Sequence, residues 1–270
     1  MKLSFSTLGC PDWTLNEIIA IASDLGYDGV EIRGVGDEIY APKSPEFSIK
    51  NIEPLKAKLA DANIEIPVFT SGAYLVDNPS LNSAESEVKD YVFLASKMGV
   101  KYVRIMGEQT PVPVCTRPDN NTLSESIISL CKFAAAFNVS LLIETNGFLA
   151  DSAIMKPFIE MIDQPNLGVL WDVNHTVRYF NEDPAYTVKM LGPHIKHVHL
   201  KDSVRGTNGI ITYMLAGYGT LPIKEAVSAL KEIGYEGYIS FEWVKRWSKG
   251  LAEPAIAFHQ FINYMKDLIQ

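Results

Sequence analysis

The feature that most constrains the fold is a regular alternation of short apolar runs with longer amphipathic stretches along the whole chain. The short runs are rich in β-branched residues, which is typical of buried strands, and the stretches between them have helical patterns. The apolar runs cover residues 2–8, 29–33, 64–70, 101–107, 140–146, 167–174, 195–202 and 238–244. The pattern therefore predicts eight strands that alternate with eight helices.

Several helical stretches carry their own start and stop signals. In the stretch 14–26, Thr14 is expected to cap the first turn, with Glu17 three residues later. Gly26, Gly99 and Gly234 each follow a helical stretch and precede a strand. A glycine at this place lets the chain adopt a left-handed conformation and turn back. These signals support the proposed division into β/α units.

Eight β/α units in 270 residues predict a TIM (β/α)8 barrel, formed by one domain that covers residues 1–270. A doubly wound open sheet is the alternative, and it usually carries a glycine-rich phosphate loop after the first strand. This chain has LGCPDW at that place, at residues 8–13. No internal repeat, low-complexity segment or linker marks a second domain.

Composition narrows the class of protein. Hydrophobic residues make up 47% of the chain, which is enough for a substantial core, yet no apolar run reaches the roughly 18 residues of a membrane span. The first residues lack the pattern of a secretory signal. Three widely spaced cysteines, Cys10, Cys115 and Cys131, argue against a disulfide framework and for a reducing compartment, so we expect a cytoplasmic protein. A net charge of −8 disfavours nucleic acid as a partner.

Four consecutive predicted strands end in a residue that can bind a divalent metal: Glu144, Asp172, His199 and Glu242. One such residue is more often solvated or salt-bridged than a ligand. Four in succession are different, because the carboxyl ends of barrel strands converge on one mouth, where the chemistry of this fold takes place. Three carboxylates and an imidazole favour Mn²⁺, Mg²⁺ or Co²⁺, with Zn²⁺ not excluded. The sequence thus predicts one site for a divalent ion.

Neighbouring histidines are assigned by their position. Side chains alternate along a strand, so His197 and His199 share a face, and His199 lies nearer the carboxyl end. We assign His199 to the metal and His197 to packing or to a contact behind the ligands. His175 comes three residues after Asp172, in the following loop, and is a candidate for binding substrate, the alternative being a surface histidine.

With these residues the chain resembles the xylose isomerase-like TIM barrels, the sugar phosphate isomerase/epimerase superfamily, over its whole length. The resemblance is closest to the ketose 3-epimerases and the inosose isomerases and dehydratases. It implies metal ligation by Glu144, Asp172, His199 and Glu242. It also implies substrate binding by His175 and by Arg205, six residues after the metal histidine. HLKD at residues 199–202 and AGYG at residues 216–219 match softer features of the family.

Other residues near the expected mouth keep two interpretations. Glu31 and Arg33 either reach the mouth from the second strand or form an ion pair. Lys201 either contacts the substrate or is solvated. Gly217 and Gly219 either contact substrate or allow a loop with positive φ. We include Glu31 and Lys201 among the expected substrate-binding residues.

Missing histidines exclude one branch of the family. Endonuclease IV resembles this chain in several elements but builds a three-zinc site with additional histidines. Here the first histidine is His175, and residues 203–219 contain neither Asp nor His. A trinuclear nuclease site therefore cannot form.

The resemblance implies a metal-dependent isomerase or epimerase acting on a small keto sugar or keto polyol through an enediolate. Glu144 and Glu242 would then move the proton, each as metal ligand and acid/base. An inosose-type dehydratase using the same site, a hydroxypyruvate isomerase-like enzyme and a noncatalytic sugar-binding barrel are the alternatives. We expect a small carbohydrate as the partner, with no nucleic acid or membrane; the oligomeric state, including a homo-oligomer, is left open.

Overall fold

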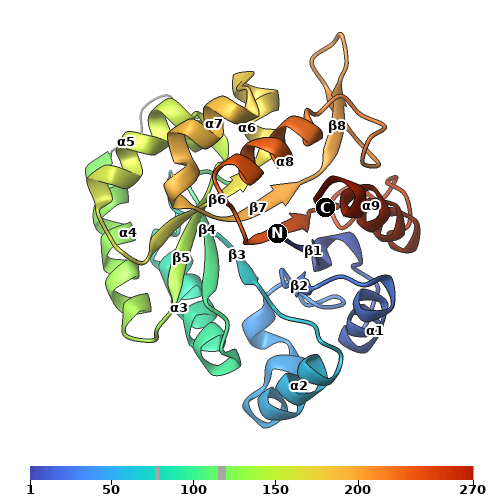
Figure 1. The fold of residues 1–270 in the computed structure, drawn as a ribbon. Coiled ribbons are helices and arrows are strands. Elements are labelled where there is room, and N and C mark those ends of the chain that lie inside the picture. Colours follow the sequence, from blue (N-terminus) through green and yellow to red (C-terminus); the bar gives the residue numbers. More distant parts are fainter. Residues whose placement is uncertain (77–78, 115–119, 270) are drawn as a thin grey trace. The chain divides into compact units, whose positions relative to one another are not determined.

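The computed structural model describes residues 1–76, 79–114 and 120–269 (Figure 1). Cys115, one of the three cysteines considered above, lies outside these residues. Within them, no helix is both long enough and apolar enough to cross a membrane. The chain divides into two compact units, one made of residues 1–67 and 198–270 and the other of residues 68–197.

The first unit contains both chain ends. Strand β1 (Lys2–Ser6) pairs in parallel with β2 (Gly29–Glu31) on one side and with β10 (Tyr238–Phe241) on the other (Figure 1). The end of β7 (Ile195–Leu200) lies next to β10, where the backbone N–H of Glu242 donates to the carbonyl of Leu200 at 3.2 Å. The other elements are α1 (Leu15–Leu25), α2 (Ile49–Asp61), β8 (Asp202–Arg205), β9 (Ile211–Met214), α8 (Ile223–Glu232), α9 (Pro254–Ile269) and the 3₁₀ turns η1 (Thr7–Gly9), η2 (Ala41–Lys43) and η3 (Pro45–Phe47).

The second unit continues the same β/α alternation. Its strands β3 (Val68–Tyr74), β4 (Tyr102–Met106), β5 (Ser140–Glu144) and β6 (Leu167–Asp172) pair in parallel in chain order. The start of β7 follows β6 in the sheet. The helical elements are α3 (Leu81–Met98), α4 (Asn120–Ala135), α5 (Ser152–Ile162), α6 (Val173–Phe180), α7 (Pro184–Leu191) and the 3₁₀ turns η4 (Gly147–Ala150) and η5 (Gly192–His194).

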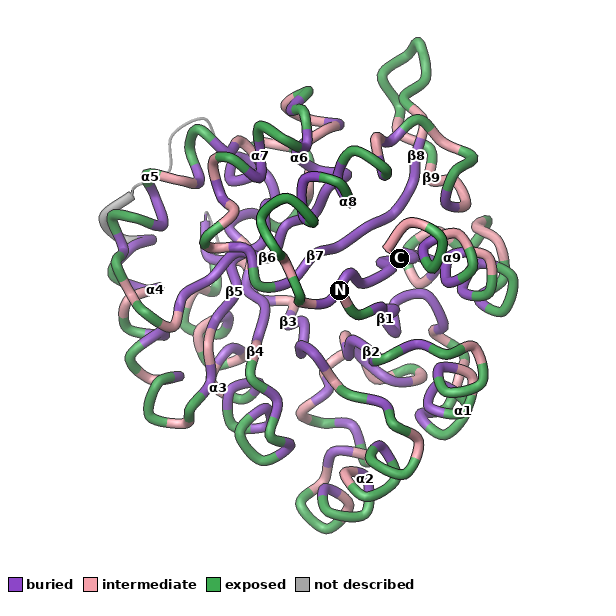
Figure 2. Tube along the Cα trace, in the orientation of Figure 1, coloured by how far each residue is buried: buried purple, intermediate pink, exposed green. Residues whose placement is uncertain are grey.

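The strand order is β2-β1-β10-β7-β6-β5-β4-β3, with β7 contributing residues to both units. Eight parallel strands in this order, connected by helices, make the fold a TIM (β/α)8 barrel, which confirms the predicted class. The strands are buried almost throughout, whereas the helices have one buried and one exposed side (Figure 2). This distribution is expected for a parallel sheet whose outer face is covered by helices.

Each unit has its own apolar packing. In the first unit, Phe258 and Phe261 of α9 stack on the strands, with ring centroids 4.1 Å from Phe5 and 4.3 Å from Phe241, respectively. In the second unit, the fully buried side chains of Val68, Leu142 and Leu170 form a cluster, against which Tyr102 packs. Large apolar side chains on adjacent strands therefore supply the burial that stabilises the sheet.

The predicted helix signals are confirmed. Thr14 accepts a hydrogen bond from the backbone N–H of Glu17, and the Glu17 carboxylate accepts from the N–H of Thr14 at 2.7 Å, a complete capping box. Gly26 and Gly99 end α1 and α3 in the left-handed conformation, with φ of 77° and 75°. Gly234, just after α8, also has a positive φ, of 66°.

After β6 the structure has two helices, α6 and α7, where one was expected, and His175, expected in a loop, lies buried in α6. Two further features differ from the prediction. Strand β3 begins at Val68 rather than at residue 64, because Pro67 lacks the N–H that a continuous strand needs. Glu65, just before Pro67, makes only an isolated bridge to Gly29. The second difference is the antiparallel hairpin of β8 and β9, in a segment to which no strand was assigned. The predicted seventh strand accordingly ends at Leu200, and Asp202 begins the hairpin.

Candidate active site

Asp172 has two structural roles at the junction of β6 and α6. It is the last residue of the strand and also the N-cap of the helix, where its Oδ1 accepts a hydrogen bond from the backbone N–H of His175 at 3.1 Å. An N-cap side chain bonds to the backbone two or three residues later, so the cap sets the spacing of three. The other oxygen, Oδ2, lies 3.4 Å from Nε2 of His175. The Asp-x-x-His spacing seen in the sequence therefore brings the two side chains together.

Glu144, at the end of β5, lies in the same cluster. Its Oε1 is 3.5 Å from Nδ1 of His175, and its Oε2 is 3.3 Å from Nη1 of Arg104. Nδ1 of His175 is also 3.0 Å from the carbonyl oxygen of Thr145, which can only accept a hydrogen bond. Nδ1 must therefore carry a hydrogen, and Nε2 faces Asp172 either protonated or with a lone pair.

The donor atoms of Glu144, Asp172 and His175 lie within 4.8 Å of one another, and all three residues are buried. Two carboxylates and one imidazole form a donor set that suits a divalent ion. The residues present in the second unit thus fit a metal. The predicted substrate-binding histidine lies among the predicted ligands.

The first unit contains a second buried cluster, around His199 of β7. Its Nε2 lies 2.8 Å from Oε2 of Glu31, and its Nδ1 lies 3.4 Å from Oε1 of Glu242. A carboxylate on one ring nitrogen sets the tautomer and leaves the other nitrogen to ligate a metal. Glu31, at the end of β2, therefore orients His199 in this structure; its substrate contact stays a prediction.

Lys201 follows β7 directly and is only 1% exposed. Its Nζ donates a hydrogen bond to Oε2 of Glu242. The alternative of a solvated lysine is therefore wrong. Its contact with substrate stays a prediction.

Arg205 lies elsewhere in the first unit, at the end of β8, and its side chain is exposed. It differs in this from the other predicted site residues, which are all buried. Its role in binding substrate stays a prediction that rests on the spacing from His199.

Asp202, the residue after Lys201, holds the AGYG segment. Its carboxylate accepts hydrogen bonds from the backbone N–H groups of Gly217 at 2.9 Å, Gly219 at 2.8 Å and Leu221 at 3.1 Å. Gly217 has a φ of 82°, and a Cβ on Gly219 would lie 2.1 Å from Oδ1 of Asp202. The interpretation as a loop with positive φ is therefore confirmed for Gly217 only, whereas Gly219, whose φ is not positive, lets the backbone close on this carboxylate.

Arg104 is the site residue that the sequence analysis missed. It lies in β4, is 4% exposed and contacts Glu144. The available signal was a charged residue in the middle of the apolar run 101–107, which in a buried strand requires a partner of opposite charge.

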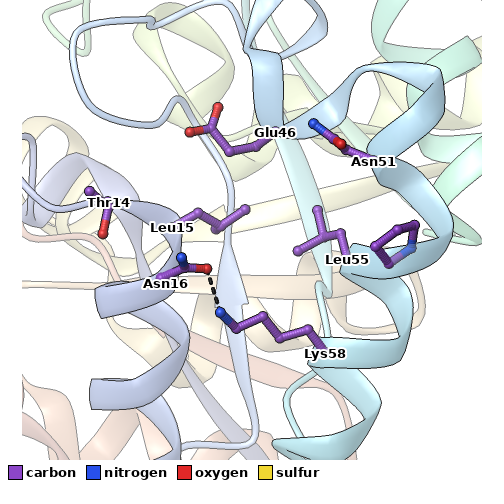
Figure 3. Close-up of a pocket in the computed structure, with 8 residues that line it drawn as sticks. Thr14, Leu15, Asn16, Glu46, Asn51, Leu55 and Lys58 are labelled. Carbon is purple, nitrogen blue, oxygen red and sulfur yellow. Dashed lines mark hydrogen bonds between the residues drawn. The ribbon is translucent and has the colours of Figure 1, made fainter.

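A cavity in the first unit lies away from these clusters, between α1 and α2 (Figure 3). Lys58 and Asn16 face each other across it and are hydrogen-bonded, and the side-chain amide of Asn51 donates to the carbonyl of Pro45 at 2.8 Å. None of the predicted site residues lines it. It contains none of the residues with metal-binding spacing, so the buried clusters remain the candidate site.

Comparison with known proteins gives consistent matches. The chain is 24% identical to fructoselysine 3-epimerase of Shigella flexneri, over 100% of this chain and 98% of that protein. It is 24% identical to inosose dehydratase of Bacillus thuringiensis strain Al Hakam, over 79% of this chain and 81% of that protein. Among solved structures, the IolI protein with a bound zinc atom matches with a TM-score of 0.82 at 18% identity, covering 100% of this chain and 98% of that one.

The family is shown by a match to a family model rather than to a single protein. The family model of the xylose isomerase-like TIM barrel matches residues 19–263, nearly the whole chain. The two relatives named above, a fructoselysine 3-epimerase and an inosose dehydratase, match over most of this chain. The chain therefore belongs to the xylose isomerase-like TIM barrel family.

Proposed function

We propose that this protein is a divalent-metal-dependent epimerase or isomerase that acts on a small keto sugar or keto polyol. The observation that carries the proposal is the environment of two buried glutamates at strand ends. Glu144 lies with Asp172 and His175 in one cluster, and Glu242 lies with His199 and Glu31 in the other. The match to a 3-epimerase over the full chain supports an enzyme that moves a proton on a sugar.

The proposed metal ligands are Glu144, Asp172, His199 and Glu242. In a TIM barrel the carboxyl ends of the strands converge on one mouth, which supports combining the two clusters into one site. When bound, a divalent ion polarises a substrate carbonyl and stabilises negative charge on the adjacent oxygen. The oxygen-rich donor set favours Mn²⁺, with Mg²⁺, Co²⁺ and Zn²⁺ as alternatives.

The chain's own residues supply the proton transfer. In the proposed reaction, one of Glu144 and Glu242 removes the proton from the carbon next to the carbonyl, leaving an enediolate. The other glutamate returns a proton from the opposite face, which inverts that carbon. His175, Arg205 and the Nζ of Lys201 are proposed to bind the substrate oxygens. Returning the proton to the neighbouring carbon instead gives an isomerase.

Metal content tests the ligand assignment. Protein purified without chelator should contain about one divalent ion per chain by elemental analysis, and His199→Ala should lose it, because the loss of one donor weakens a four-donor site. His259→Ala is the matched control, since His259 is exposed on α9 and should keep the ion. Full metal occupancy in a folded His199→Ala protein would contradict the assignment.

Solvent exchange tests the reaction. Candidate ketoses incubated in D₂O with Mn²⁺ should acquire deuterium next to the carbonyl. Glu144→Gln and Glu242→Gln should each reduce turnover by at least about 10²-fold, because each removes a base while keeping the size of the side chain. Metal content must be measured on the same variants. A metal-replete variant with the wild-type exchange rate would exclude that glutamate as an acid/base.

Dehydration of an inosose is the second candidate function, because the relatives matched over 79% of this chain include inosose dehydratase. The same proton abstraction followed by loss of a β-hydroxyl gives this reaction. The D₂O experiment separates the candidates: exchange without loss of water supports the epimerase or isomerase, and loss of water supports the dehydratase. Silence over a broad panel of ketoses, hydroxypyruvate and inososes favours a sugar-binding barrel.

A further inference from the structure

The two proposed acid/base glutamates have the same pattern of neighbours. In Glu144, Oε2 lies 3.3 Å from Nη1 of Arg104 and Oε1 lies 3.5 Å from Nδ1 of His175. In Glu242, Oε2 accepts a hydrogen bond from Nζ of Lys201 and Oε1 lies 3.4 Å from Nδ1 of His199. In each unit, then, one carboxylate oxygen contacts a buried cation and the other contacts a histidine.

Both cations are anchored on the strand next to that of their glutamate. Arg104 belongs to β4, which pairs with β5, and its carbonyl accepts a hydrogen bond from the Ser71 hydroxyl at 2.6 Å. Lys201 directly follows β7, which lies next to β10 in the sheet. Each cation is therefore carried by backbone in, or directly after, a strand of the sheet.

Burial makes these contacts consequential. Arg104 and Lys201 are 4% and 1% exposed, and a buried charge of either sign requires an opposite charge beside it. In a surface ion pair, water can replace either partner, but the guanidinium of Arg104 and the ammonium of Lys201 have little access to water. The glutamate oxygen nearest the cation is consequently held in place.

We propose that Arg104 and Lys201 determine which oxygen of each glutamate takes part in the reaction, Arg104 as a positioning residue and Lys201 in addition to its proposed contact with substrate. Each cation holds Oε2, so that Oε1 is presented on the histidine side for ligation and proton transfer. This inference rests on the proposed two-glutamate function. Its physical basis is that a proton transfers efficiently only at short range and in good alignment, so that a displacement of about 1 Å can reduce a rate by 10²-fold.

A two-base epimerase allows this to be tested one glutamate at a time, because each glutamate deprotonates only one of the two epimers. Glu144→Gln and Glu242→Gln first establish which epimer depends on which residue. Deuterium exchange is then measured from each epimer with Arg104→Met and Lys201→Met. We expect Arg104→Met to lower exchange by about 10²-fold from the epimer that depends on Glu144, and Lys201→Met to do so from the other.

Conservative and control variants separate positioning from a general loss of structure. Arg104→Lys keeps the positive charge but lacks the planar guanidinium group. It should lower deuterium exchange from the same epimer as Arg104→Met, by a smaller factor. This variant provides the test if Arg104→Met does not fold. Lys245→Met removes another buried lysine, whose Nζ bonds to the backbone of Leu251 and to Glu253. It should change exchange from both epimers by the same factor.

The affinity for Mn²⁺ without substrate, measured by calorimetry, is a property that does not depend on turnover. Arg104→Met and Lys201→Met should still bind the ion, because neither residue is proposed as a ligand. Equal losses from both epimers, or a folded variant without Mn²⁺ binding, would overturn the positioning role while the proposed function stands. A wild-type protein that exchanges no proton on any ketose would instead overturn the proposed function itself.

Discussion

Gly147, three residues after Glu144, should be one of the least replaceable glycines in the chain. Its φ is 58°, and a Cβ at this position would lie 2.0 Å from Oε2 and 2.6 Å from Cβ of Glu108. The Glu108 carboxylate accepts hydrogen bonds from the backbone N–H of Phe148 at 2.6 Å and from that of Val114 at 3.0 Å. Gly147→Ala must therefore displace a carboxylate that holds two loops.

The expected loss of stability follows from these contacts. Hydrogen bonds to a charged group contribute about 1.5–3 kcal/mol each, and we take the lower value because Val114 is largely exposed. Two bonds then give about 3 kcal/mol, and the left-handed backbone adds about 1 kcal/mol for a residue with a Cβ. We expect Gly147→Ala to lower the free energy of unfolding by about 4 kcal/mol. Gly99→Ala is the matched control, with a φ of 75° and no atom within 4 Å of its Cβ, and should cost only about 1 kcal/mol.

Urea denaturation of both variants at pH 7, with the free energy taken from the midpoint and slope, measures the difference. Glu108→Gly should remove the clash, because alanine would keep the Cβ of Glu108 at 2.6 Å, so adding Gly147→Ala to Glu108→Gly should cost no more than about the backbone strain of 1 kcal/mol. Losses for Gly147→Ala and Gly99→Ala that agree within about 1 kcal/mol would refute the reasoning, because the carboxylate would then move aside without cost.

Three further outcomes are expected. Asp202→Ala removes the acceptor of several backbone N–H groups and should lower the melting temperature by at least about 5 °C, measured by circular dichroism, with the exposed Asp24→Ala unchanged. Burial raises the pKa of the Cys131 thiol to about 12, so a thiol reagent at pH 8 should modify it only after urea is added; modification in the native protein at the rate of a free thiol would contradict this. The hydrogen bond from Lys2 holds the pKa of Glu65 below its usual value, so its stabilisation is present above the unfolded-state pKa and is lost as pH falls through the folded-state pKa. Glu65→Gln should therefore lower the free energy of unfolding by less than about 1 kcal/mol at pH 7 and by nothing near pH 2, and an equal loss at both pH values would exclude this cause.

The fold could be predicted because each strand is a local pattern of apolar, β-branched residues. The apolar runs 140–146 and 167–174 show this, because they contain β5 and β6. Glu144 is the last residue of β5, and Asp172 is the last residue of β6. The β8–β9 hairpin was missed although its two four-residue strands are close along the chain. Its strands are partly exposed, so they lack the apolar runs that marked the others.

The candidate site could be predicted only in part, for a related reason. Sequence position identified residues at strand ends, but it could not show which charge each would meet. Lys201 and Glu242 are 41 residues apart, and their contact depends on β7 and β10 lying side by side. Arg104 was missed because a lone charge in a strand does not identify its partner.

The cap that Asp172 forms on α6 has a consequence for how this part of the chain can vary. One side chain ends a strand, starts a helix and faces His175, so the Asp–His geometry is encoded within four consecutive residues. An eight-residue helix is stable only when it packs against the rest of the protein, so this geometry depends on the packing of α6. It also tolerates no insertion, because one additional residue between the two would rotate the histidine by about 100° around the helix axis. Length variation in this protein is therefore expected to occur outside residues 172–175.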